Sequence, residues 1–176
     1  FTQLETFFKQ FDIGSFFRVG AILIDPGHGG KDPGTTGSYV ENGKTIPVYE
    51  KNIALSVSLS LYDMLRKTYP DKKILLTRSD DTYPSLEERV EMANKVLLKK
   101  NEAILYISIH ANASPFNKAP YGFEIWYLPT DYRRDVIDKN ATSKEIAHIL
   151  NIMLEEEFST ESILIAKNIP CAHFCK

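Results

Sequence analysis

The sequence predicts a three-layer α/β domain with a mostly parallel sheet and helices on both faces. Three observations support this fold class. Continuous apolar runs, typical of strands buried on both sides, end abruptly in loops that contain Gly or Pro. Segments with apolar residues at helical spacing separate these runs. The chain of 176 residues is long enough for one such domain with a full core, and it is short for two.

The elements of the first half alternate in this way. Residues 1–17 place phenylalanines at helical spacing, so we expect an N-terminal extension or a short helix. The first strand lies within the run 19–26. Residues 31–48, rich in Gly, Pro, Thr and Asn, are expected to form a long loop over the sheet edge. A helix is expected over Lys51–Tyr69. The residues expected to face the core from this helix are Ile53, Val57, Leu61, Met64 and Leu65.

The second half continues the alternation. Ser85 and Glu88 have the spacing of a capping box, which places the start of a helix there. The residues that this helix is expected to bury are Leu86, Val90, Ala93 and Leu97. The expected elements are a strand over 73–77, a helix from 85 to about 100, strands over 103–110 and 121–128, and helices over 142–158 and 160–168.

Composition and charge exclude several classes of function. With 43% hydrophobic and 25% charged residues, the chain has the composition of an ordinary globular domain. Its net charge of -2 offers no basic surface, so we expect no nucleic-acid partner. No apolar run approaches the roughly 20 residues that cross a bilayer. Both cysteines lie near the C-terminus, so the body of the domain carries no information on its redox compartment.

We expect one domain over residues 18–170, preceded by the extension at 1–17 and followed by a divergent tail at 171–176. Because the chain begins with Phe1 rather than Met, we expect a longer or processed precursor with a regulatory or targeting domain elsewhere in it. The tail places Cys171, His173 and Cys175 close together, as in a small metal clip. An unstructured terminus is the favoured interpretation, because these three ligands have no supporting fold.

Two of the buried strands end in a histidine. The run 19–25 leads to His28 in a Gly-rich turn, and the run 103–109 leads directly to His110. Because ligands gather at the carboxyl ends of the strands in such sheets, the two histidines are expected to lie close together. Imidazole nitrogens and a carboxylate suit a zinc-type ion, and Glu50, at the start of a helix, is the candidate third ligand. A single histidine of this kind is an ordinary loop residue, whereas the pair favours a metal site.

These residues belong to a series of short motifs in a fixed order. They are Ile24–Gly30, Glu50–Leu55, Leu76–Arg78, Leu86–Arg89 with Ala93–Asn94, Ser108–Asn112 and Gly122–Glu124. Over roughly residues 19–168, the sequence thereby resembles the zinc-dependent N-acetylmuramoyl-L-alanine amidases, which cut bacterial peptidoglycan.

The resemblance implies that His28, Glu50 and His110 bind Zn²⁺. It implies hydrolysis of the amide bond between N-acetylmuramic acid and L-alanine, with peptidoglycan or a muropeptide as the substrate. The implied location is the bacterial cell envelope, periplasmic or extracellular, and the implied role is cell-wall degradation, as by an autolysin or in cell division.

The resemblance also implies a second glutamate, near the carboxyl end, that passes a proton to the leaving amine. Its Val-Glu-x-Gly-Phe context is not found, and the sequence departs from the family at about Pro170, so the catalytic residue is unknown. Glu124 is the nearest substitute, since its predicted strand follows the His110 loop. Three alternatives stay open: an active amidase, a domain that binds zinc and peptidoglycan without efficient cleavage, and a truncated or frameshifted enzyme. A generic zinc peptidase ranks lower, because His-Glu-x-x-His is absent.

Three other polar residues are candidates for the same edge of the sheet. Arg78 ends the second strand and is expected to bind an anionic peptide carboxylate there. Arg89 lies on a helix, where we expect a structural ion pair. Asn112, just beyond His110, is expected either to hydrogen-bond substrate or to orient the ligand loop.

Overall fold

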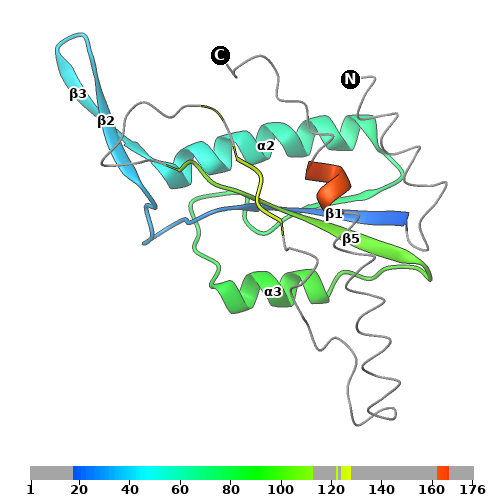
Figure 1. The fold of residues 1–176 in the computed structure, drawn as a ribbon. Coiled ribbons are helices and arrows are strands. Elements are labelled where there is room, and N and C mark those ends of the chain that lie inside the picture. The colour runs from blue at the N-terminus through cyan, green and yellow to red at the C-terminus, as the bar shows by residue number, and fades with distance from the viewer. Residues whose placement is uncertain (1–17, 113–121, 123, 128–161, 167–176) are drawn as a thin grey trace. The chain divides into compact units, whose positions relative to one another are not determined.

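The computed structural model describes residues 18–112, 122, 124–127 and 162–166. The chain divides into two compact units. One unit is Phe16–Phe116, and the other combines Phe1–Ser15 with Asn117–Lys176. All the strands and helices labelled in Figure 1 belong to the first unit.

Several sequence predictions concern the second unit. Residues 162–166 are helical, in agreement with the helix expected over 160–168. The strand expected over 121–128 does not appear in its described residues, 122 and 124–127, which have no strand pairing. The N-terminal extension, the helix expected over 142–158 and the tail at 171–176 lie outside the described residues.

A three-stranded parallel sheet forms the centre of the Phe16–Phe116 unit (Figure 1). Its strands are β1 (Arg18–Pro26), β4 (Lys73–Leu76) and β5 (Glu102–Ile109), in the order β4-β1-β5. The central strand β1 supplies most of the core, as its continuous apolar sequence predicts. Because Pro26 pairs with Ile109, β1 and β5 end side by side at one edge of the sheet.

Helix α2 (Glu50–Thr68) covers one face of this sheet, and α3 (Leu86–Asn94) lies on the other side (Figure 1). The mostly parallel sheet with helices on both faces was predicted, and it is confirmed. The predicted core stripe of α2 was partly wrong, because Ile53, Val57 and Met64 are exposed while Leu65 is buried. The small residues Ala54 and Ser58 are fully buried instead, and small side chains let the helix backbone lie close to the sheet.

The start of α3 is the capping box that the sequence predicts. The Glu88 N–H donates to Ser85 Oγ at 3.2 Å, and the Ser85 N–H donates to the Glu88 carboxylate at 2.7 Å. The helix ends at Asn94 rather than near residue 100. The predicted apolar core face was wrong: Arg89 is the residue that α3 buries, because its guanidinium reaches the polar turn after β1. The leucines and valine expected inside are exposed, with exposed fractions of 74% for Leu86, 58% for Val90 and 81% for Leu97.

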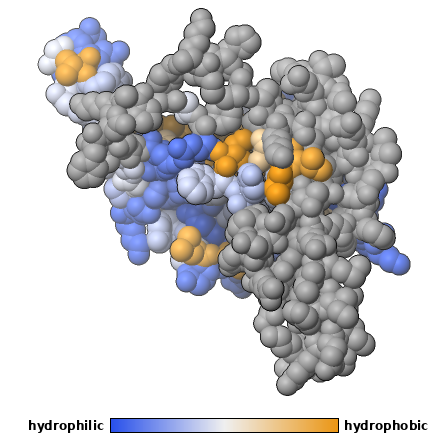
Figure 2. Space-filling view, viewed as in Figure 1, coloured by the Kyte–Doolittle hydropathy of each residue, from blue (hydrophilic) through white to orange (hydrophobic). Residues whose placement is uncertain are grey.

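A β-hairpin replaces the long loop expected over residues 31–48. Strands β2 (Thr36–Glu41) and β3 (Lys44–Tyr49) pair antiparallel. The backbone φ angles of Asn42 and Gly43 at the tip are 50° and 74°, as a type I′ turn requires. Most of the hairpin is exposed, and Figure 2 shows one small hydrophobic patch on its otherwise hydrophilic surface. A strand without a buried face has no apolar alternation, so periodicity did not reveal it.

No helix in the described ranges combines the length and the apolar sequence that spanning a membrane would need.

Candidate metal centre

His28 lies in a tight turn after β1, and its backbone is left-handed, with a φ of 60°. Gly29 and Asp32 close the turn by donating to each other's carbonyls, both at 2.9 Å. Few residues with a side chain adopt this conformation, which costs about 1–3 kcal/mol and tends to occur at functional sites. The turn places the half-buried imidazole at the carboxyl edge of the sheet, as the sequence predicts.

Glu50 is the first residue of α2 and is buried, with 5% of its surface exposed. The Thr35 N–H donates to Oε2 at 2.8 Å, and the Ala111 N–H donates to Oε1 at 2.9 Å. Burial raises the pKa of Glu50, but these two backbone donors and the His110 ring outweigh it and lower the pKa from 4.5 to about 2. The carboxyl group is therefore ionised at neutral pH and held from two sides.

His110 follows β5 directly and lies beside the turn that carries His28. The Gly27 N–H donates to the Ile109 carbonyl at 2.9 Å, which joins the ends of the two strands. A Cβ atom at Gly27 would lie 2.6 Å from Nε2 of His110, so glycine is required for the ring to fit. The two imidazole rings meet edge to face, with centroids 4.9 Å apart.

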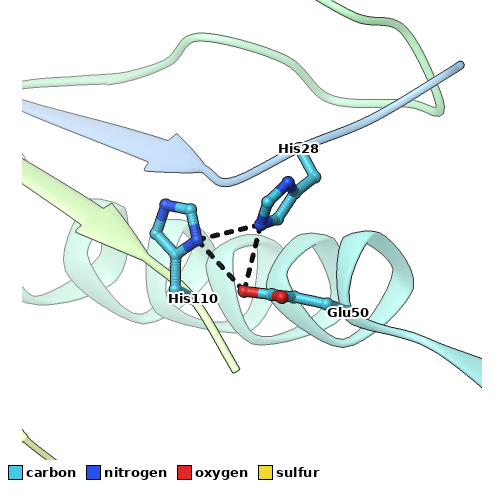
Figure 3. A group of neighbouring side chains, drawn as sticks. All are labelled: His28, Glu50 and His110. Carbon is cyan, nitrogen blue, oxygen red and sulfur yellow. Dashed lines mark hydrogen bonds and ion pairs between the residues drawn. The ribbon is translucent and has the colours of Figure 1, made fainter. Parts of the chain in front are cut away.

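Three ligand atoms converge where these segments meet (Figure 3). His28 Nε2 and His110 Nδ1 lie 3.2 Å apart, and they lie 3.2 Å and 3.0 Å, respectively, from Oε1 of Glu50. In a tetrahedral zinc site with bonds of about 2.0–2.2 Å, ligand atoms are about 3.3–3.6 Å apart. The triangle is therefore close to the size that zinc needs, and its donor types are those that zinc prefers. The His110 side chain is 44% exposed, so the cluster is open to solvent.

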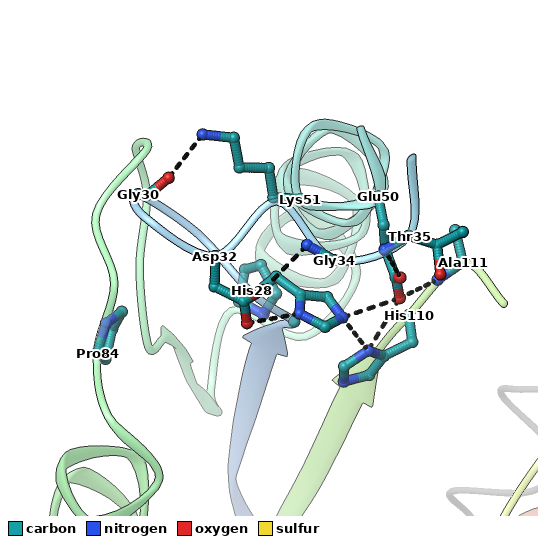
Figure 4. Close-up of polar contacts among 12 residues, drawn as sticks. His28, Gly30, Asp32, Gly34, Thr35, Glu50, Lys51, Pro84, His110 and Ala111 are labelled. Atoms are coloured by element: carbon teal, nitrogen blue, oxygen red, sulfur yellow. Dashed lines mark hydrogen bonds and ion pairs between the residues drawn. The ribbon is translucent and has the colours of Figure 1, made fainter. Parts of the chain in front are cut away.

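Asp32 orients the first of these ligands (Figure 4). Its Oδ2 lies 2.8 Å from Nδ1 of His28, and its Oδ1 accepts the Gly34 N–H at 3.1 Å. The His28 contact and the Gly34 N–H lower the pKa of Asp32, so it is a carboxylate that holds the proton on Nδ1 and leaves a lone pair on Nε2. Sequence reasoning missed Asp32, although it lies four residues after His28 in the same Gly-rich turn.

Arg78 does not face the edge where a substrate carboxylate was expected. Its side chain is turned inward, the residue is 4% exposed, and the guanidinium donates to four backbone carbonyls. These carbonyls belong to the end of β1, the turn that follows it, the loop after β4 and the first turn of α2. The expected role of Arg78 toward a substrate carboxylate stays a prediction. Arg89 does form the structural ion pair that was expected, with Asp25.

Asp25 is the buried acceptor at the end of β1. It accepts from Thr77 Oγ1 at 2.6 Å, from Ser108 Oγ at 2.8 Å and from the Arg89 guanidinium. Burial raises the pKa of Asp25, but these three donors outweigh it and lower the pKa overall. A charged carboxylate therefore links β1, the loop after β4, β5 and α3, close in the chain to both His28 and His110.

The other predicted site residues are Asn112 and Glu124. Asn112 is exposed and follows Ala111, whose N–H binds Glu50. Glu124 belongs to the second unit, where its carboxylate accepts from Trp126 Nε1 at 3.1 Å. Their expected roles stay predictions. The tail cysteines lie outside the described residues.

Comparison with known proteins identifies the family of the chain. A family model described as N-acetylmuramoyl-L-alanine amidase matches residues 22–170. The probable N-acetylmuramoyl-L-alanine amidase AmiB of Haemophilus influenzae is 40% identical over 124 residues, which are 69% of this chain and 25% of that protein. The sporulation-specific N-acetylmuramoyl-L-alanine amidase of Bacillus subtilis is 36% identical over 108 residues, which are 61% of this chain and 36% of that protein. The chain therefore spans about a third or less of the length of these two relatives.

A solved structure supports the fold. The N-acetylmuramoyl-L-alanine amidase AmiC2 of Nostoc punctiforme superposes with a TM-score of 0.50 at 21% sequence identity. The superposition covers 89% of this chain and 96% of that one.

Proposed function

Since the chain belongs to the N-acetylmuramoyl-L-alanine amidase family, we propose that it hydrolyses the amide bond between N-acetylmuramic acid and L-alanine in peptidoglycan, with one zinc ion held by His28, Glu50 and His110. The observation that carries this proposal is the convergence of the three ligand atoms, which lie 3.0–3.2 Å apart in pairs. They come from three separate segments of the chain, which the fold brings to one edge of the sheet.

The donor set favours zinc in a catalytic rather than a structural site. Catalytic zinc sites use three protein ligands and leave a fourth position for water or substrate. Two imidazoles with one carboxylate match this pattern, and the exposed side of His110 leaves room for the fourth position. When bound, zinc would lower the pKa of its water to about 7 and would polarise the scissile carbonyl.

The residues of this chain prepare the site for that chemistry. Glu50, with its pKa at about 2, supplies a negative charge without first losing a proton. Asp32 holds the proton on Nδ1 of His28, so that Nε2 is free to bind the metal. The backbone donors of Thr35 and Ala111 fix the Glu50 carboxylate in position.

The mechanism also needs a group that protonates the leaving amine, and the sequence assigns none. Among the described residues of the Phe16–Phe116 unit, no further Asp, Glu, Cys or His joins the group of His28, Glu50 and His110. Asp32, the nearby carboxylate, is engaged with His28 and Gly34. We propose Glu124 as the candidate donor. This observation also favours a second function, in which the domain binds zinc and peptidoglycan without efficient cleavage.

The same proposal places the protein in the bacterial cell envelope, periplasmic or extracellular, because its substrate is there. The domain would extend over residues 18–170, in keeping with the family match over 22–170. A regulatory or targeting domain elsewhere in the precursor would bring it to its substrate.

Release of stem peptides from purified muropeptides, followed by mass spectrometry, tests the proposal. We expect zinc-dependent release that a chelator stops and that Glu50→Ala abolishes. Glu41→Ala, at the exposed tip of the hairpin, serves as the matched control and should leave release unchanged. One bound zinc per chain without release would support the binding function, and a chain that binds no zinc would contradict both functions.

A further inference from the structure

Two buried arginines surround the turn that carries His28. Arg78 is 4% exposed, and Arg89 is 5% exposed. A buried guanidinium is costly unless its donors are satisfied. Nearly all the acceptors of these two side chains are backbone carbonyls, and three of those carbonyls are consecutive, in Pro26, Gly27 and His28.

Arg78 ties together the segments that carry two of the ligands. A single nitrogen, Nη2, donates to the Gly27 carbonyl at 2.7 Å and to the Lys51 carbonyl at 2.9 Å. Gly27 directly precedes His28, and Lys51 directly follows Glu50. The bridge therefore sets the spacing between the backbones on which these two ligands stand.

Arg89 holds the strained residue itself. Its Nη2 donates to the His28 carbonyl at 2.8 Å, and its Nη1 donates to the Pro26 carbonyl at 3.0 Å and pairs with Asp25. The left-handed backbone of His28 needs such contacts to persist, because the surrounding structure must compensate for its strain.

The third ligand is joined to the same network. Asp25, the partner of Arg89, also accepts from Ser108 Oγ at 2.8 Å, two residues before His110. The three ligand-bearing segments are thus connected through two guanidinium groups and one carboxylate.

We propose that Arg78 and Arg89 are positioning residues of the metal centre, which hold the backbone of Pro26–His28 and of the first turn of α2 so that His28 and Glu50 present their ligand atoms at binding distance before the metal arrives. This inference deepens the proposed function and rests on it. Lysine cannot replace either arginine in this role, because only the planar guanidinium reaches several carbonyls in fixed directions.

Metal titration of the metal-free full chain tests the proposal, with Zn²⁺ for affinity and Co²⁺ as a spectroscopic probe. We expect Arg78→Lys and Arg89→Lys to bind zinc about tenfold or more weakly, as is typical when groups that orient metal ligands are lost. The visible absorption of bound Co²⁺ should also change, because the ligand geometry relaxes. Arg66→Lys, on the exposed side of α2, is the matched control and should behave as the parent.

The outcomes separate this inference from the proposed function. Folded lysine variants that match the parent in zinc affinity and in cobalt spectrum would overturn the positioning role alone. A parent chain that binds no zinc would overturn both proposals. If the lysine variants do not fold, hydrogen exchange of the arginine Nε–H groups in the metal-free parent decides. Slow exchange of the Nε–H groups of both arginines would show that their hydrogen bonds exist before metal binding. Fast exchange would overturn the positioning role.

Discussion

Nδ1 of His28 lies 2.8 Å from the Asp32 carboxylate, while Nε2 of the same ring lies 3.2 Å from Oε1 of Glu50. The imidazole is therefore held between two carboxylates, one on each nitrogen. The Asp32 side fixes the tautomer and the orientation of the ring, and the Glu50 side faces the position of the proposed metal.

This arrangement predicts that Asp32→Asn weakens zinc binding by about 10–100-fold, because the neutral amide no longer increases the basicity of the ring. A competition titration with a chromophoric chelator measures the loss. Asp71→Asn is the control, since Asp71 is exposed and pairs only loosely with Lys72, at 3.7 Å. Equal zinc affinities for the two variants would refute an orienting role for Asp32.

Gly34→Ala should impair both stability and zinc affinity. Gly34 has a φ of 63°, and a Cβ atom there would lie 2.6 Å from Cδ2 of His28 and 2.8 Å from Oε2 of Glu50. The left-handed backbone alone costs a residue with a side chain about 1–2 kcal/mol, and the contacts would push the two ligands apart. Chemical denaturation and zinc titration of the same preparation measure the two effects.

Gly43→Ala separates the cost of the left-handed backbone from the effect of the contacts with the ligands. Gly43 has a similar φ of 74° at the tip of the hairpin, and a Cβ atom there would meet nothing within 4 Å. This variant should show the backbone cost without any loss of zinc affinity. If Gly34→Ala and Gly43→Ala bind zinc equally well, the close approach of Gly34 to the ligands does not affect zinc affinity.

The stability of the metal-free protein should fall in acid in part because of Glu50. Its pKa is about 2 in the folded chain, against an ordinary value of 4.5, so folding favours the ionised form. The stability from Glu50 is fully present above about pH 4.5 and is lost as the pH falls toward 2. The free energy of unfolding of Glu50→Gln should therefore depend less on pH in this window, and equal slopes for variant and parent would contradict the prediction.

Ser58→Ala should leave stability unchanged or raise it by up to about 1 kcal/mol. Ser58 lies fully buried in α2, and its hydroxyl has no hydrogen-bond partner among the described residues. Removing an unpaired buried hydroxyl relieves a desolvation cost, and the cavity that remains is small. Urea denaturation measures the change, and a clear destabilisation would show that the hydroxyl has a partner.

The sequence alone locates the ligand cluster because strand ends and helix starts are local signals. The apolar runs before His28 and His110 predict the parallel strands, and parallel strands bring their ends together. The capping box at Ser85 is equally local, and it is confirmed.

The missed features depend on long-range contacts or on exposed surfaces. The sequence predicts a substrate contact for Arg78 and an ion pair for Arg89, but only the folded chain brings backbone carbonyls around the two guanidinium groups. The β2–β3 hairpin has no buried face, so its one local signal was the Asn42-Gly43 pair at the tip. Asp32 lacks any periodic pattern, and its importance comes from the direction in which the turn aims it.

The amount of zinc bound per chain, measured for the purified protein and for His28→Ala, Glu50→Gln and His110→Ala, shows whether these three residues hold the metal. We expect one tightly bound zinc in the parent and a large loss of affinity in each variant, while Glu41→Gln on the exposed hairpin should bind zinc as the parent does. A parent without zinc, or zinc binding that survives all three ligand substitutions, would contradict the proposed metal site.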